Sequence, residues 1–187
     1  MKKMILSAML LSSALMFSAC NTNKTEDSTE VAEEQNEQKL DSTDMDDDAE
    51  FAVAAADGGL MEVKLGELAQ TNAADPKVKE FGKNMITDHG KAGEELHAAA
   101  TKKNITLPTG LSDEKQKKYD ELAAKKGAEF DKAYVSFMVD DHKDDISEFE
   151  KAAKECKDPD LKTWAEGKLP TLRHHLEMAQ SLDETKK

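Results

Sequence analysis

Two stretches of the sequence place an aspartate and a histidine side by side, each pair at the same distance from a methionine and an aromatic residue. Asp88 and His89 occur in FGKNMITDHG, and Asp141 and His142 occur in YVSFMVDDHK. Imidazole nitrogens bind zinc, copper and iron, and a carboxylate that accepts the other ring N–H fixes the orientation of the ring. Because the chain has only five histidines, two identical placements indicate a shared role.

Both histidines lie on apolar stripes with helical spacing. In each stripe an apolar residue recurs every three or four positions, as on the buried face of an α-helix. The first stripe consists of Val78, Phe81, Met85, His89, Ala92, Leu96 and Ala99, and the second of Phe130, Tyr134, Met138, His142, Ile146, Phe149, Ala153 and Cys156. We therefore expect each histidine to face the interior of a helical domain.

The ends of the helices are marked by two Asp-Pro pairs, at 75–76 and 158–159. Each pair combines a favoured N-cap residue with a proline that is tolerated in the first helical turn. The stretches that begin there, DPKVKEF and DPDLKTW, resemble each other and indicate an internal repeat. Ser112 begins a further short helix at 112–125. The sequence thus predicts an all-α fold, a four-helix bundle of two hairpins with an extra short helix in the middle connection.

In such a bundle, one polar residue from each long helix reaches the same level. At a rise of about 1.5 Å per residue, counting from the two hairpin turns places the four within roughly 10 Å of one another along the axis. These residues are Glu62, His89, His142 and His175. Three nitrogen ligands and one carboxylate would suit iron, copper or zinc. Asp88 and Asp141 would then accept the remaining ring N–H groups.

A metal-free network is the alternative for the same residues. Each aspartate would pair with a histidine on a neighbouring helix, and a fully satisfied network of this kind fixes the register of the helices. Asp131 and Tyr134, three residues apart on one helical face, would join it through a link between hydroxyl and carboxylate. The residue types and their spacing leave both interpretations open.

The N-terminus predicts a lipid anchor. Lys2 and Lys3 precede an apolar run from Met4 to Phe17, which is long enough for a signal peptide and too short to span a membrane. The run leads through small residues into Cys20, a pattern that resembles the lipobox of bacterial lipoproteins. We expect a signal peptide at 1–19 and a lipidated Cys20, which leaves Cys156 without a disulfide partner and makes it a packing residue.

Residues 20–49 are expected to form a disordered tether. From residue 21 on they hold eleven acidic residues against two lysines, a net charge of −9, with very few apolar side chains. Such a segment cannot offset its chain entropy by burial. The folded domain is therefore expected at 50–184. The chain has no basic patch, which excludes nucleic acid as a partner.

Residues 50–180 resemble the bacterial family catalogued as domain of unknown function 4142. The resemblance is carried by FAVAAADGGLMEVKLGELA, FGKNMITDHGKA, ITLP, GAEFDKAYVSFMVDDH and LPTLRHHLEMA. It implies a ferritin-like fold, an outer-membrane or periplasmic location and no particular activity. Its motif positions fall on Glu62, Asp88, His89, Asp131, Tyr134, Asp141, His142 and His175. The sequence departs from di-iron bundles, because Glu-x-x-His occurs only once, at 94–97.

Together these observations predict a lipid-anchored protein of the cell envelope, on the periplasmic or the surface face of the outer membrane. Its ferritin-like bundle would be a non-enzymatic binding or stress-related module whose core takes up a transition metal. A metal-dependent redox enzyme and a purely structural bundle are the alternatives. An enzyme requires a channel to His89 and His142, whereas a structural bundle requires every ring nitrogen to be paired. The predicted partner is a membrane, through Cys20, and a homo-oligomer is compatible with the sequence.

Overall fold

The computed structural model describes residues 27–40 and 45–184, and these form six helices without a strand. The helices are α1 (Ser28–Leu40), α2 (Asp46–Asn72), α3 (Pro76–Lys102), α4 (Asp113–Ala123), α5 (Gly127–Glu155) and α6 (Pro159–Glu184). The expected all-α bundle is confirmed, including the short helix in the middle connection. The expected signal peptide and the lipidated Cys20 lie outside the described residues. None of the described helices is long and apolar enough to cross a membrane.

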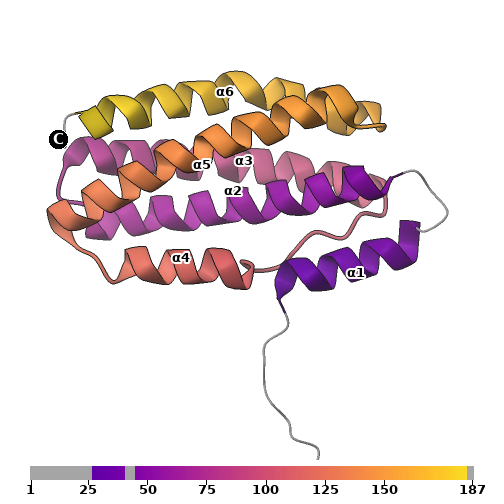
Figure 1. Cartoon of the computed structure of the whole chain (residues 1–187), viewed down its shortest axis with the longest axis horizontal. Helices are drawn as coiled ribbons and strands as arrows, with labels where there is room; N and C mark the ends of the chain where they lie inside the picture. The colour runs from indigo at the N-terminus through magenta and orange to yellow at the C-terminus, as the bar shows by residue number, and fades with distance from the viewer. Residues whose placement is uncertain (1–26, 41–44, 185–187) are drawn as a thin grey trace, which may run out of the picture.

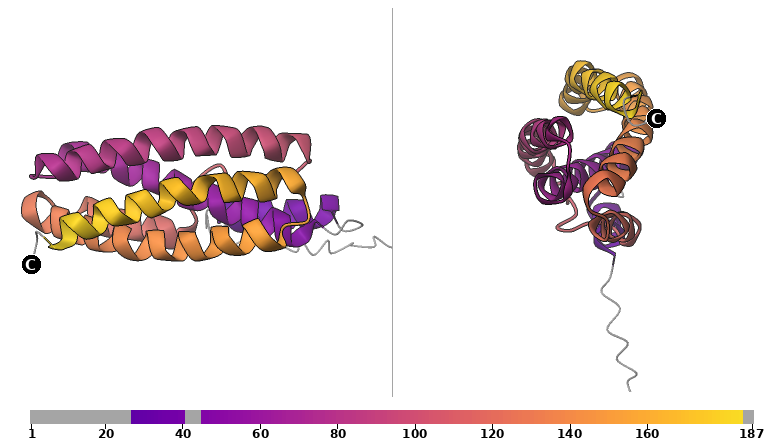
Figure 2. Two further views of the ribbon diagram at one scale, coloured as in Figure 1. Left: turned by 90° about the horizontal axis from the view of Figure 1, so that it is seen from above. Right: turned by 90° about the vertical axis from the view of Figure 1, so that its left-hand side faces the viewer.

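The bundle consists of two helical hairpins, α2 with α3 and α5 with α6 (Figure 1). Helices α3 and α5 run in the same direction, because the connection that contains α4 returns along the length of the bundle. Seen from the end, the two hairpins lie beside each other, and α1 and α4 lie on one side of them (Figure 2). This long crossover is the connectivity of ferritin-like bundles.

The predicted caps begin the helices as expected. Asp75 accepts the backbone N–H of Lys77 at 2.9 Å, and Ser112 accepts that of Lys115 at 3.3 Å. Asp158 accepts the N–H of Leu161 at 2.9 Å in the same way. These bonds satisfy N–H groups that the first turn of a helix leaves without an internal partner.

The N-terminal segment differs from the expectation of a disordered tether up to residue 49. Residues 28–40 form α1, and α2 begins at Asp46. Ala32 and Leu40 are buried, and the buried side chain of Asn36 exchanges two hydrogen bonds with the backbone of Thr106, at 2.9 and 2.6 Å. Few apolar residues are enough here because the three buried residues Ala32, Asn36 and Leu40 recur every fourth position, and the polar one of them bonds to a distant loop.

The core has two apolar parts separated by a polar layer. On one side of the layer the apolar residues gather around Met61, Phe81, Met85, Phe130, Tyr134 and Met138. On the other side they form two neighbouring clusters, which include Leu96, Phe149, Leu161, Ala165 and Leu172. Along α3, α5 and α6 the polar layer lies between them, for example at His89 between Met85 and Leu96. Four helices therefore present polar side chains to one another at mid-bundle.

Candidate metal site

The polar layer brings together the four side chains that the sequence placed at one level. They are Glu62 from α2, His89 from α3, His142 from α5 and His175 from α6, each at most 8% exposed. One ring nitrogen of each histidine lies within 4.8 Å of one from each of the other two. The ring centroids are 5.2 to 5.7 Å apart. A cluster of this composition and size can hold a metal ion.

Three of these residues form a chain that ends at the surface. Glu62 Oε2 lies 2.5 Å from His89 Nδ1, and His89 Nε2 lies 3.2 Å from His175 Nδ1. His175 Nε2 lies 2.9 Å from Asp88 Oδ2, and the Asp88 side chain is 44% exposed. Asp88 thus holds a histidine from another helix, as the sequence analysis expected of it. Its partner is His175 and not its neighbour His89.

His142 is held differently. Its Nδ1 donates a hydrogen bond to the backbone carbonyl of Met138, one turn earlier on α5, at 3.0 Å. Its Nε2 lies 3.4 Å from Glu62 Oε1, and neither atom has a hydrogen-bond partner. Buried polar atoms are normally paired, so these two are exceptions, as are the Tyr134 hydroxyl and the Trp164 ring N–H among the described residues.

Burial favours the neutral imidazole at all three histidines of the cluster. Burial, followed by the neighbouring His89 and His175, lowers the pKa of His142 to about 3. Burial likewise lowers the pKa of His175 to about 4, against the effect of Asp88. Burial, and then the charge of Asp141, raises the pKa of Glu62 well above its ordinary value. At neutral pH the imidazoles are therefore uncharged, and each has one nitrogen lone pair available.

The hydrogen-bond partners allow two arrangements of protons. If Glu62 carries a proton, Glu62, His89 and His175 can each donate to the next group, ending at Asp88. If Glu62 is ionised, His89 donates to Glu62, and its Nε2 lone pair then faces the lone pair of His175 Nδ1. In both arrangements, as long as Oε1 carries no proton, His142 Nε2 and Glu62 Oε1 face each other as two acceptors, whereas a neutral Glu62 with its proton on Oε1 would donate to His142 Nε2. Only a proton or a cation between them removes this mismatch.

Sequence reasoning missed Asp145 and Lys115, which complete the polar layer. One oxygen each of Glu62, Asp141 and Asp145 lies within 4.8 Å of the others and of a nitrogen of His142. Asp145 follows Asp141 by one helical turn, and this spacing could have identified it. The expected bond from Asp141 to a ring N–H is replaced by this contact with carboxylates. Burial and Lys115 act in opposite directions on the pKa of Asp141, which rises to about 6.

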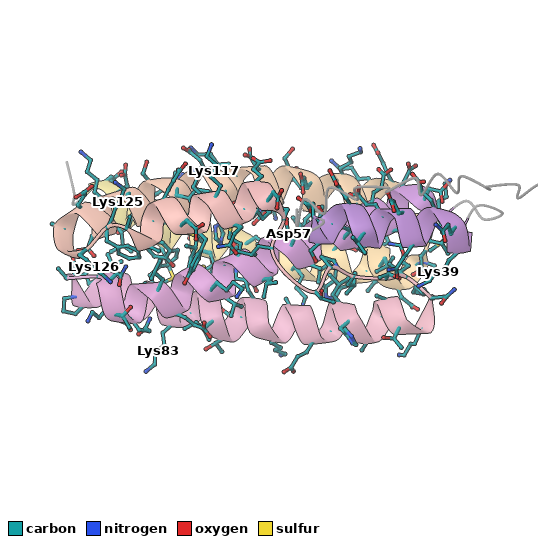
Figure 3. All side chains as sticks on the ribbon, turned by 90° about the horizontal axis from the view of Figure 1, so that it is seen from below. Lys39, Asp57, Lys83, Lys117, Lys125 and Lys126 are labelled. Atoms are coloured by element: carbon teal, nitrogen blue, oxygen red, sulfur yellow. The ribbon has the colours of Figure 1, made fainter. Side chains whose placement is uncertain are left out.

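Lys115 reaches the polar layer from α4, which Asp57 helps to position. Asp57 Oδ1 accepts the backbone N–H of Ser112 at 3.0 Å, just before α4 begins. Figure 3 shows Asp57 near the middle of the molecule, between α1 and α4. Burial lowers the pKa of Lys115, but Asp141, Asp57 and Asp145 together raise it above its ordinary value. Lys115 is therefore the cation of an otherwise acidic layer.

The expected link between Asp131 and Tyr134 is absent. The two oxygens of Asp131 accept the backbone N–H groups of Ala74 and Asp75, at 3.1 and 3.0 Å. The Tyr134 hydroxyl is buried without a hydrogen-bond partner, and its ring stacks on Phe130 with the centroids 5.4 Å apart. Asp131 faces the hairpin turn because the unpaired N–H groups there compete successfully for a carboxylate.

The remaining expectations concern residues outside the cluster. His97 and His174 are exposed, and neither ring belongs to the cluster. Cys156 is buried and free, in agreement with a packing role.

A cleft of about 490 Å³ adjoins the cluster. Its lining includes Glu62, Asp88 and His89, together with apolar side chains such as Leu96 and Trp164. At three glycines on its walls a side chain would project into open space: Gly59, Gly90 and Gly93. His142 is not part of the lining, so the cleft reaches the cluster from the side of His89.

The fold and the site define an all-α bundle with a buried cluster of histidines and carboxylates at its centre. The chain belongs to the family described as domain of unknown function (DUF4142), whose profile matches residues 30–182. The match includes most of α1, which the sequence analysis had left outside the domain. No curated protein sequence matches the chain.

A similar solved structure is titled "CopM in the Cu(II)-bound form". It is 14% identical in sequence, with a TM-score of 0.64, and the alignment covers 75% of this chain and 97% of that one. At this level of identity the similarity establishes a common fold.

Proposed function

We propose that this protein binds a copper ion in the core of its bundle and does so as a lipid-anchored, non-enzymatic protein of the cell envelope. The observation that carries the proposal is the pair formed by His142 Nε2 and Glu62 Oε1, two buried polar atoms 3.4 Å apart, neither of which has a hydrogen-bond partner. A metal ion bound at His142 Nε2 provides the positive charge that both atoms lack.

The arrangement of the other imidazoles supports a nitrogen-rich site. His89, His142 and His175 would be the ligands, with their second ring nitrogens held by Glu62, by the Met138 carbonyl and by Asp88. Metal-bound histidines in proteins are held in this way. Nitrogens that bind one ion at about 2.0 Å lie about 2.8 Å apart when adjacent in a square-planar site and about 3.3 Å apart in a tetrahedral one. The 3.2 Å between His89 Nε2 and His175 Nδ1 falls within this range.

Copper is favoured by two arguments. Imidazole ligands suit copper, zinc and iron, and among divalent ions copper binds such sites most tightly. The structure titled "CopM in the Cu(II)-bound form" shares the fold. A metal-free structural network fits less well, because it requires every ring nitrogen to be paired and His142 Nε2 is not.

Copper binding is tested on the full chain, purified in detergent without an affinity tag. We expect about one Cu(II) per chain, with nitrogen splittings in its electron paramagnetic resonance spectrum, and loss of this signal in His142→Ala. His174→Ala is the matched control, because His174 is exposed and next to His175. Equal copper binding by His142→Ala and the unchanged protein would overturn the proposal.

A redox enzyme is the second candidate function, and the cleft that reaches His89 favours it. An enzyme would oxidise a small reductant with dioxygen faster than the same amount of free copper. Equal rates for the copper-loaded protein and free copper would reject this candidate.

The lipid anchor rests on the sequence, in which small residues lead into Cys20 after an apolar run. Cys20→Ser tests it by detergent phase partitioning of the protein from its own cell envelope. We expect the unchanged protein in the detergent phase and the variant in the aqueous phase. The same partitioning of both proteins would reject the anchor.

A further inference from the structure

Three carboxylates gather beside the imidazoles. Asp141 and Asp145 lie one turn apart on α5 and therefore project to the same side, towards Glu62 on α2. One oxygen of each lies within 4.8 Å of one from each of the others. Glu62 is 1% exposed, and the two aspartates are half-buried. Like charges at this separation repel each other strongly in a partly desolvated position.

The groups around these carboxylates do not balance their charge. Among the described residues, Lys115 is a lysine whose charge acts on all three carboxylates, and Asp57 from α2 adds a further carboxylate near it. Lys115 Nζ and Asp145 Oδ1 both lie 3.9 Å from the position of a Cβ on Gly58, so they reach the same face of α2. No carboxylate of the described residues pairs with Lys115 within 4.0 Å. The ammonium group is therefore near the carboxylates without being bound by any of them.

One atom of this group points to a ligand independently of the acidic character of the cluster. Glu62 Oε1 is buried and has no hydrogen-bond partner, whereas Oε2 of the same side chain contacts His89. A buried carboxylate oxygen left unpaired costs free energy that a bound cation recovers. Oε1 is on the side of Glu62 that faces α5, as its distance to His142 shows.

We propose that Glu62, Asp141 and Asp145 form a second cation position beside the imidazole site, specific for a divalent ion that prefers oxygen ligands. Manganese(II), magnesium and calcium are such ions, and water would complete their coordination. Glu62 would be common to both positions: its Oε2 holds the ring of His89, and its Oε1, on the side that faces α5, would bind the second cation. The proposal deepens the metal-binding function proposed above and rests on the same buried core, but it assigns different residues and a different class of ion.

Manganese(II) is the probe, because free Mn(II) gives a six-line electron paramagnetic resonance signal that disappears on binding. The full chain in detergent, with copper already bound, is expected to take up about one further Mn(II). Asp141→Asn and Asp145→Asn should each weaken this uptake about tenfold or more and leave the copper signal in place. Asp144→Asn is the matched control, since Asp144 is exposed on the same helix.

The outcomes separate the two positions. Loss of copper in His175→Ala with Mn(II) uptake unchanged is the expected result and supports two separate positions. Copper binding without any Mn(II) uptake, or Mn(II) uptake that Asp141→Asn and Asp145→Asn leave unchanged, would overturn the second position alone.

Lys115→Met gives a test with all three carboxylates intact. Removing the competing ammonium should raise the affinity for Mn(II) about tenfold, and an unchanged or lower affinity would contradict the proposal.

Discussion

Asp48 and Asp131 each accept two backbone N–H groups from the turn of the opposite helical hairpin. Asp48, in the first turn of α2, accepts the backbone N–H groups of Lys157 and Asp158 in the turn between α5 and α6, at 3.0 and 2.7 Å. Asp131, near the start of α5, accepts those of Ala74 and Asp75 in the turn between α2 and α3. Each hairpin is thus closed by a carboxylate from the other one.

Replacing either carboxylate should destabilise the whole bundle. Asp48→Ala and Asp131→Ala each leave two N–H groups without their charged acceptor in a largely buried position. We expect each variant to lose about 3 kcal/mol of unfolding free energy, measured by urea denaturation followed by circular dichroism. Asp47→Ala is the control, because Asp47 is exposed in the same turn of α2 and its loss should be nearly neutral. Equal midpoints for Asp47→Ala and Asp48→Ala would contradict this account.

Helices α2 and α3 approach most closely where two glycines face each other. A Cβ on Gly66 would lie 2.5 Å from the carbonyl oxygen of Gly82, and one on Gly82 would lie 2.8 Å from Ala69 Cβ. We expect Gly66→Ala to lower stability by about 2 kcal/mol, because backbone atoms would have to move apart. Gly93→Ala, on the exposed face of α3 with nothing within 4 Å, should instead raise stability by about 0.5–1 kcal/mol. Thermal unfolding of both variants measures the contrast, and destabilisation by both would reject close helix contact as the cause.

The fold could be predicted because its signals are local. The two Asp-Pro caps and the stripes of apolar residues depend only on near neighbours in the sequence, and counting from the turns brought Glu62 and His89 to one level. Helix α1 was missed because its stability depends on Asn36 reaching Thr106, seventy positions away. No local pattern contains that information.

The sequence brought Glu62 and the three histidines of the candidate site together, but it missed Asp145 and Lys115 and most of the contacts. Asp88 and Asp141 occur in the same sequence motif, yet one holds His175 and the other faces Asp145. Asp131 bonds to backbone N–H groups, and because nearly every residue carries one, the sequence does not indicate this partner. Which partner a polar side chain finds depends on the rotation of each helix in the bundle. That rotation is set by packing and not by the motif itself.

Acid should weaken the contact between the end of α3 and the start of α6. Lys103 Nζ lies 2.5 Å from Asp158 Oδ2, and Asp158 also caps α6. Burial opposes ionisation of Asp158, but Lys103 and the N–H of Leu161 hold its pKa below the ordinary value of 3.8. A carboxyl whose pKa is lowered on folding contributes stability above its unfolded pKa and loses it as the pH falls through the folded value.

Asp158→Asn isolates this contribution. Between about pH 6 and pH 2.5 the unchanged protein should lose more unfolding free energy than the variant, because the variant has no proton to take up at this position. Asp160→Asn is the comparison, since Asp160 contacts the same lysine but its side chain is 72% exposed. Parallel pH profiles for the unchanged protein and Asp158→Asn would show that the pair contributes nothing.

Cys156 should be unreactive in the folded protein. It is buried, and burial, followed by the negative charge of Asp48, raises the pKa of its thiol to about 12. The thiolate is the reactive form, so at about pH 8 only about one thiol in ten thousand can react. Iodoacetamide labelling followed by peptide mass spectrometry, which separates Cys156 from Cys20, should show slow reaction without urea and fast reaction in urea. Equal rates would mean that Cys156 is exposed.

Asn36 should be the residue that keeps α1 on the bundle. Its side chain donates to the Thr106 carbonyl and accepts the Thr106 N–H, so it replaces the hydrogen bonds that the loop between α3 and α4 cannot form internally. Ala32 and Leu40, one turn to either side, are buried beside it. In Asn36→Ala these apolar contacts remain, but both backbone groups of Thr106 lose their partner.

We expect Asn36→Ala to release α1 and the loop locally while the four long helices stay folded. Hydrogen exchange should become faster in residues 28–40 and 105–112 and stay slow in α3 and α5, because local opening costs less than global unfolding. Gln38→Ala is the matched control, since Gln38 is exposed on the same helix. Faster exchange throughout the bundle would show that α1 stabilises the entire domain. No change in residues 28–40 would show that Ala32 and Leu40 hold the helix without Asn36.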